Sequence, residues 1–161
     1  FWQITEDSLD KSMKVFNIDT SMKNELLSLY KVLSPYPEVK EVLTNLKKKN
    51  LKLAILSNGT PGLINELVNT NNLDAAFDDL FSIEEVKIYK PDSKVYDLPI
   101  DKYKIQPKEV VFLSANTWDV SGGGNFGYNA VWVNRSNSHF DILDYKPKKE
   151  IKNLKGLLEI V

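Results

Sequence analysis

The chain has 161 residues, of which 42% are hydrophobic and 27% charged, and its formal net charge is −1. This length suits one domain with a substantial core, and the balanced charge gives no general attraction to nucleic acid or to an anionic membrane. The absence of cysteine excludes disulfides, thiolate metal sites and a cysteine nucleophile. No apolar run approaches the ~20 residues needed to span a bilayer, and no basic-then-apolar leader is visible, so we expect a cytoplasmic protein.

The first 34 residues predict a small helical subdomain. Thr5, followed by two acidic residues, is a candidate helix start. Apolar residues then recur at helical spacing, first at Leu9, Met13 and Phe16 and then in a second helix at Leu26, Leu29, Tyr30 and Leu33. Because proline disfavours helix, residues 35–37 should end this region and act as a hinge. We therefore divide the chain into residues 1–34 and 35–161.

Beyond the hinge, helical and strand patterns alternate. Strands are predicted at residues 51–56, 80–83, 110–113 and 130–133. Helices are predicted around residues 39–46 and 60–68, from Asp92, at 119–126, and after Asn153. Pro99 should kink or end the helix that begins at Asp92. This alternation is typical of α/β proteins with a doubly wound parallel sheet.

Small polar residues follow two of the predicted strands at the point where each apolar run ends. In an open α/β sheet, ligands bind beyond the carboxyl ends of the strands. We therefore expect one crevice lined by Ser57, Asn58, Ser114, Asn116 and Asp119, with Lys90 reaching it from a loop. A lysine that faces the aspartate would keep both groups ionised, and the Ser-Asn-Gly turn before a helix suits an anion such as a carboxylate or phosphate.

Each of these features also has a purely structural reading. A Ser-Asn-Gly turn is often just a capped turn, and most loop lysines are solvated. Gly122, Gly123 and Gly124 lack the Lys-Ser/Thr pair of a phosphate-binding P-loop, so either close helix–strand packing or a tolerance for any small residue is the better interpretation. His139, the sole histidine, reads as structural or exposed. Trp118 and Phe1 are either core aromatics or walls of an apolar pocket.

The motifs, taken in order, resemble the haloacid dehalogenase superfamily and, within it, the (S)-2-haloacid dehalogenases. The resemblance rests on FWQITEDSL, LSPYPEV, LKLAILSNG, FDDLFSIEEVKIYKPDSKVY, VVFLSANTWDVSGGGNFGYNAVWVNR and EIKNLKGLLEIV. It implies a Rossmann-like core at residues 35–161, with residues 1–34 as the C-terminal part of a helical cap. It also implies cofactor-independent hydrolysis of short (S)-2-haloalkanoic acids to (R)-2-hydroxy acids through an aspartyl ester.

The resemblance assigns a role to each candidate residue. Ser57 and the Ser57–Asn58 backbone would hold the substrate carboxylate, and the Asn58 side chain would help bind the departing halide. Lys90 would pair with the nucleophile and with Asp119, which would position or activate the hydrolytic water. Orienting roles would fall to Tyr96, Ser114 and Asn116, and the apolar pocket around the halogen-bearing carbon would include Phe1 and Trp118.

One residue separates the chain from the phosphatases of the superfamily, and one segment of the family pattern is missing. Phosphatases of the superfamily bind Mg²⁺ with a pair of acids, but Ala115 stands four residues before Asp119 and offers no ligand atom, so we expect no metal. The family's first strand, with its aspartate nucleophile, has no counterpart in these residues. We expect that it lies upstream or on another chain, or that an altered sheet fills the gap. Without it, the strands that end at Leu56 and Leu113 would each have an unpaired edge.

We further expect a small haloacid or similar carboxylate as ligand, no nucleic acid or membrane partner, and a homodimer. Two alternatives stay open: a phosphatase-like hydrolase of the same superfamily, and a truncated, non-catalytic domain that binds a small carboxylate or a protein.

Overall fold

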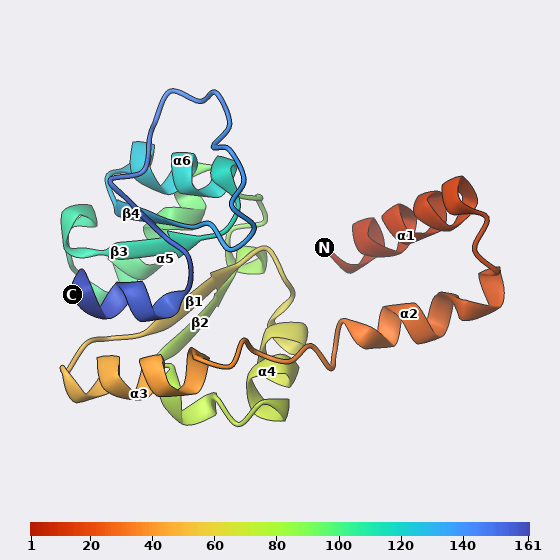
Figure 1. The fold of residues 1–161 in the computed structure, drawn as a ribbon, viewed down its shortest axis with the longest axis horizontal. Coiled ribbons are helices and arrows are strands. Elements are labelled where there is room, and N and C mark those ends of the chain that lie inside the picture. Colours follow the sequence, from red (N-terminus) through yellow and green to blue (C-terminus); the bar gives the residue numbers. More distant parts are fainter.

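The computed structural model describes all of residues 1–161. Two helices, α1 (Trp2–Phe16) and α2 (Lys23–Leu29), form an arm that extends away from the remainder of the chain (Figure 1). The α/β part then contains four helices, α3 (Val39–Lys48), α4 (Pro61–Thr70), α5 (Ser93–Tyr103) and α6 (Thr117–Phe126). Its strands are β1 (Ala54–Ser57), β2 (Asp79–Ser82), β3 (Val111–Ser114), β4 (Asn129–Val133) and β5 (Lys149–Ile151). None of the helices has the length and apolar character that crossing a membrane requires.

All strand pairs are parallel, but they form two separate sheets. One sheet pairs β1 with β2, and the other has the order β3-β4-β5. Strand β4 shows how the layers are built, because its side chains alternate between two buried clusters. Val131 and Val133 pack with α3, whereas Ala130 and Trp132 pack with Val120 of α6. Helices therefore cover both faces, as the predicted doubly wound α/β architecture requires.

Strands β1 and β3 each have an unpaired edge. Strand β1 is hydrogen-bonded only to β2, and β3 only to β4. Most of their apolar side chains, among them Ile55, Leu56, Phe112 and Leu113, are only half-buried, whereas those of β4 are almost all buried. The sheet is therefore interrupted between β1 and β3, which is where we predicted that a central strand would be absent.

The predicted hinge lies against the carboxyl end of β4. Arg135, just beyond that strand, places Nη2 2.7 Å from Oε1 of Glu38, and its guanidinium lies over the Tyr36 ring, 3.6 Å from the ring centroid. Glu38 also accepts a hydrogen bond from the Leu154 N–H group. The sole arginine of the chain thus fixes the start of α3 to the core.

Several predicted boundaries at the N-terminal end were wrong. Helix α1 starts at Trp2 rather than at Thr5, whose hydroxyl donates back to the Phe1 carbonyl from inside the helix. The second helix ends at Leu29, and the three residues that follow it form a tight turn instead of extending to Leu33.

Nearer the C-terminus, the expectation that Pro99 ends its helix was wrong, whereas the predicted Asn153 cap of the last helix is confirmed. Helix α5 runs past Pro99 to Tyr103, so the proline does not end it near Leu98. Its ring costs the helix one backbone bond, but its fixed φ is compatible with helix. The last helical segment, Leu154–Glu159, is a 3₁₀ helix capped by Asn153.

The interpretation of the three glycines as packing residues is confirmed. A Cβ atom on Gly123 would lie 2.7 Å from Cδ1 of Phe112 in β3. One on Gly122 would lie 2.5 Å from the Tyr96 hydroxyl oxygen, and one on Gly124 would overlap the Tyr145 ring. Helix α6 approaches its neighbours so closely that only glycine fits at these positions.

Candidate active site

The carboxyl ends of β1 and β3 meet at one crevice. The turn after β1 holds Asn58, whose Oδ1 accepts a hydrogen bond from the backbone N–H of Lys90 at 3.1 Å. The Lys90 side chain then reaches Asp119 in the first turn of α6, directly after β3. Residues far apart in sequence are thereby joined at the edge of the sheet where an α/β fold binds ligands.

Lys90 and Asp119 form a buried ion pair, as predicted. Nζ of Lys90 lies 3.2 Å from Oδ2 of Asp119, and each side chain is 7% exposed. The other carboxylate oxygen, Oδ1, accepts a hydrogen bond of 2.8 Å from the hydroxyl of Tyr96. The lysine ammonium also lies 5.3 Å from the centroid of the Phe112 ring. Each charge thus has a partner that compensates for its removal from water.

Burial changes the acidity of the groups around this pair. Desolvation lowers the pKa of the Lys90 ammonium from its ordinary value of 10.5, although the neighbouring Asp119 carboxylate acts in the opposite direction. Desolvation also raises the pKa of the Tyr96 phenol, and Asp119 raises it further. Tyr96 therefore stays protonated and keeps donating to Asp119, while Lys90 is the group more easily deprotonated.

Three further polar side chains of the crevice, Ser57, Asn58 and Ser114, each accept a hydrogen bond from a backbone N–H group. Oγ of Ser57 accepts from the Gly59 N–H at 2.9 Å, and Oγ of Ser114 accepts from the Asn116 N–H at 3.2 Å. The side-chain oxygen of Asn58 is occupied by the Lys90 N–H, which leaves its NH₂ group available. The hydroxyl protons of Ser57 and Ser114 and the NH₂ group of Asn58 donate to no protein acceptor, so they are available to an anionic ligand.

Two helices begin at this edge of the sheet. Thr60 caps α4, its hydroxyl accepting from the Leu63 N–H at 3.3 Å. Asn116 occupies the cap position of α6, but its side chain makes no capping hydrogen bond and is exposed. The positive ends of two helix dipoles add to the donor groups.

Comparison with known proteins identifies the family. A family model described as haloacid dehalogenase-like hydrolase matches residues 1–133. The chain is 37% identical to (S)-2-haloacid dehalogenase 1 of Pseudomonas sp. (strain CBS-3), covering all of this chain and 72% of that protein. It is 38% identical to (S)-2-haloacid dehalogenase 4A of Burkholderia cepacia, covering 84% of this chain and 59% of that protein.

A solved structure is similar as well. It is the L-2-haloacid dehalogenase from Xanthobacter autotrophicus with chloropropionic acid covalently bound, which matches with a TM-score of 0.89 and 26% identity over 99% of this chain and 74% of that one.

The chain belongs to the haloacid dehalogenase-like hydrolase family. Within the family it groups with the (S)-2-haloacid dehalogenases, which are hydrolases that act on carbon–halide bonds. It spans between 59% and 72% of the length of the two curated relatives named above.

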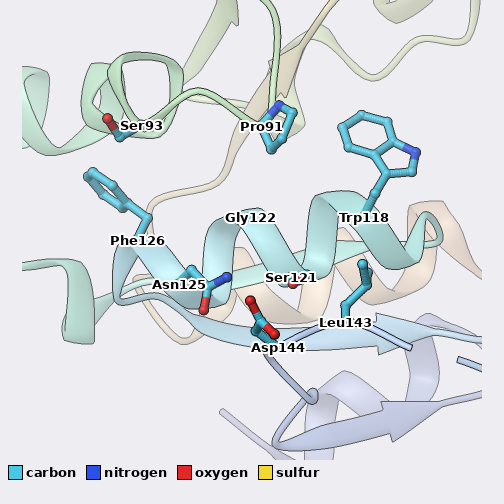
Figure 2. Close-up of a pocket in the computed structure, with 9 residues that line it drawn as sticks. All are labelled: Pro91, Ser93, Trp118, Ser121, Gly122, Asn125, Phe126, Leu143 and Asp144. Atoms are coloured by element: carbon cyan, nitrogen blue, oxygen red, sulfur yellow. The ribbon is translucent and has the colours of Figure 1, made fainter. Parts of the chain in front are cut away.

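A groove on the outer face of α6 adjoins the crevice that holds Lys90 and Asp119. Its volume is about 460 Å³, and it lies between the Pro91–Ser93 loop, α6 and the loop that carries Leu143 and Asp144 (Figure 2). Trp118, which is 41% exposed, lies at one end of this groove near Pro91. Phe1 lies at the start of α1 in the arm, half-exposed. Their assignment as walls of the substrate pocket stays a prediction.

Sequence reasoning missed two aromatic residues that contact the candidate site. Phe112 carries the ring beneath the Lys90 ammonium, and the hydroxyl of Tyr128 donates to the backbone carbonyl of Tyr96. Both positions read as ordinary core residues. Only the alternation of side chains along β3, which places Phe112 on the α6 face, hinted at the first contact.

The structure contains no group of three or more His, Cys, Asp or Glu side chains arranged to hold a metal ion. At the position where phosphatases of the superfamily have a second acid, Ala115 contributes its carbonyl to a hydrogen bond from the Trp132 indole. The expectation of metal-independent chemistry stays a prediction.

Proposed function

We propose that this site hydrolyses the carbon–halogen bond of short (S)-2-haloalkanoic acids, giving (R)-2-hydroxy acids without a metal or cofactor. The observation that carries this proposal is the set of outward donors beside a buried ammonium, formed by Ser57, Asn58 and Lys90. Such a set matches a substrate with one carboxylate and a halogen that leaves as an anion. The (S)-2-haloacid dehalogenases named above act on this chemical class.

The substrate carboxylate is proposed to bind at the turn after β1. The Ser57 hydroxyl and the Ser57–Asn58 backbone would hold it, close to the positive end of α4. The Asn58 amide, held in place through the Lys90 backbone, is then free to donate to the departing halide. Ser114 and Asn116 extend the donor surface toward β3.

The nucleophile is proposed to be an aspartate on a parallel strand that fills the interruption between β1 and β3. The unpaired edges and half-buried apolar side chains of these strands support this proposal. A carboxylate at the carboxyl end of that strand would lie between the turn after β1 and the Lys90–Asp119 pair. There the ammonium of Lys90 would keep it ionised.

The proposed reaction has two steps. The aspartate oxygen attacks C2 of the haloacid, the carbon–halogen bond breaks and the halide departs with the bonding electrons. Water, oriented by Asp119, then attacks the carbonyl carbon of the aspartyl ester, and the ester C–O bond breaks. One water proton goes to the oxygen of the departing hydroxy acid, the other is released to solvent, and the aspartate carboxylate is regenerated. Because only the first step breaks a bond at C2, the configuration there is inverted once.

Residues 1–34 are proposed to be part of a cap over the crevice. The arm exposes several apolar side chains that a neighbouring segment or subunit would cover, among them Val15, Phe16, Leu29 and Leu33. This exposure supports the predicted homodimer. The cytoplasmic location likewise stays a prediction.

A direct comparison of substrates tests this function against its main rival. The full protein, meaning residues 1–161 together with the proposed aspartate-bearing strand, should release chloride from 2-chloropropionate equally well with EDTA or with Mg²⁺. It should leave p-nitrophenyl phosphate intact. Phosphate ester hydrolysis that requires Mg²⁺ would establish the phosphatase reading instead. Propionate binding without any turnover would support the non-catalytic alternative.

The proposed strand has its own test. Residues 1–161 alone should release no chloride from 2-chloropropionate, whereas a protein that also carries the aspartate-bearing strand should do so. Replacing that aspartate by asparagine should abolish turnover while the sheet stays complete. Turnover by residues 1–161 alone would contradict the proposed nucleophile.

A further inference from the structure

Ser82 is a buried residue that links the end of β2 to the turn after β1. It is 1% exposed, and its register partner across the two strands is Ser57. Its hydroxyl donates a hydrogen bond of 2.7 Å to the carbonyl oxygen of Gly59. Gly59 lies inside the Ser57–Thr60 segment, where we place the substrate carboxylate.

The local hydrogen bonds fix the direction of that hydroxyl. The Ser82 N–H donates to Oε1 of Glu85 at 3.3 Å, and the Glu84 N–H donates to the Ser82 Oγ at 3.2 Å. Together these bonds form a capping box. Because Oγ already accepts from Glu84, its own proton is directed to Gly59, and the serine cannot reorient without losing a bond.

The bond to Gly59 sets the orientation of the peptide between Gly59 and Thr60. In a trans peptide the N–H points opposite to the C=O. With the Gly59 carbonyl held toward β2, the Thr60 N–H points away from β2, which is the direction of the unpaired edge of β1. No backbone acceptor within the chain takes this N–H.

We propose that Ser82 is a positioning residue, which orients the Gly59–Thr60 peptide so that the Thr60 N–H joins the Ser57 hydroxyl in binding the substrate carboxylate. This inference rests on the proposed function. Ser82 acts through the loop and touches no reacting atom, so its loss should weaken binding of the carboxylate more than it slows the chemical step.

Kinetics of Ser82→Ala and Ser82→Thr in the full protein test this role. The alanine variant should raise KM for (S)-2-chloropropionate by about tenfold with kcat changed less than about threefold, since one buried hydrogen bond is lost. The dissociation constant of propionate, a non-reactive carboxylate, should rise in parallel. Threonine keeps the hydroxyl and should restore most of the affinity.

Glu85→Ala is the matched control, because it removes the other half of the capping box and leaves the bond from Ser82 to Gly59 in place. It should lower the melting temperature without raising KM. An unchanged KM in folded Ser82→Ala, or an equal rise in Glu85→Ala, would overturn the inference.

If the wild-type protein binds propionate but releases no chloride, the proposed function fails while the propionate measurement still decides the role of Ser82. No propionate binding by the wild type overturns both.

Discussion

Lys90 and Asp119 lie together in a nearly dry part of the crevice, where each charge depends on the other. Replacing Lys90 with methionine keeps the length of the side chain but leaves Asp119 with Tyr96 as its hydrogen-bond donor. Two carboxylates, Asp119 and the proposed nucleophile, would then repel each other, and one would take up a proton. We predict that Lys90→Met lowers kcat for chloride release by about 100-fold.

Lys94 provides a matched control for this substitution, because it is an exposed lysine one turn further along the same segment. Lys94→Met should leave kcat unchanged. Thermal unfolding of both variants separates a loss of chemistry from a loss of fold. A Lys90→Met protein that is folded and retains its full kcat would exclude Lys90 from the active site.

The depressed pKa of Lys90 predicts how activity and stability depend on pH. Burial places the folded-state pKa of Lys90 below 10.5, so the native ammonium loses its proton at a lower pH than the unfolded one does. As the pH rises toward 10.5, the unfolded chain therefore binds more protons at this site, and the stability of the wild type should rise relative to Lys90→Met. Activity should change in the opposite direction, because catalysis needs the charged form.

The pH profile of kcat/KM between about pH 7 and pH 10.5 measures this effect. We predict a decline on the alkaline side, with an apparent pKa below 10.5. Tyr96 cannot cause it, because the phenol has a raised pKa. Lys90→Arg, whose charge persists to about pH 12 or higher, should be slower than the wild type but should lack this decline. An identical alkaline decline in the arginine variant would assign the titration to another group.

At the scale of elements, the position of α6 depends on its glycines. A Cβ atom at Gly123 would lie 2.7 Å from Cδ1 of Phe112, whose ring also lies beneath Lys90. We predict that Gly123→Ala lowers the free energy of unfolding by about 1–3 kcal/mol through overpacking, despite the better helix propensity of alanine. Chemical denaturation measures the change.

Gly62→Ala in α4 is the control, since nothing lies within 4 Å of the Cβ position there. It should leave stability unchanged or raise it by up to about 1 kcal/mol. Equal effects of the two alanines would show that α6 does not approach β3 as closely as described.

The elements that the sequence predicted correctly are those with strong local signals. Thr60-Pro61 and Asp92 cap α4 and α5 as expected, and apolar runs end in polar residues at β1 and β3. Strand β5 was missed because two of its three residues, Lys149 and Glu150, are charged and exposed. Its strand conformation comes from pairing with β4, a tertiary contact that no local pattern reveals.

At the scale of the molecule, topology explains why much of the site could be predicted. Parallel strands bring their carboxyl ends to one edge, so residues after β1 and β3 were expected to meet, and the contact between Lys90 and Asp119 is confirmed. The hydrogen bond from Ser82 to Gly59 and the contact of the Phe112 ring with the Lys90 ammonium could not be predicted. Both depend on side-chain packing between neighbouring strands and helices. The interruption of the sheet was expected because no segment of the chain matches the first strand of the family it resembles.

Chloride release from the two enantiomers of 2-chloropropionate by the full protein tests the central claim most directly. Attack by an aspartate at C2, with the carboxylate held at Ser57 and the halide at Asn58, admits one configuration. We predict that the (S) enantiomer is converted to (R)-lactate, while the (R) enantiomer stays intact. Release of chloride from neither enantiomer, or formation of (S)-lactate from the (S) substrate, would contradict the proposed site and mechanism.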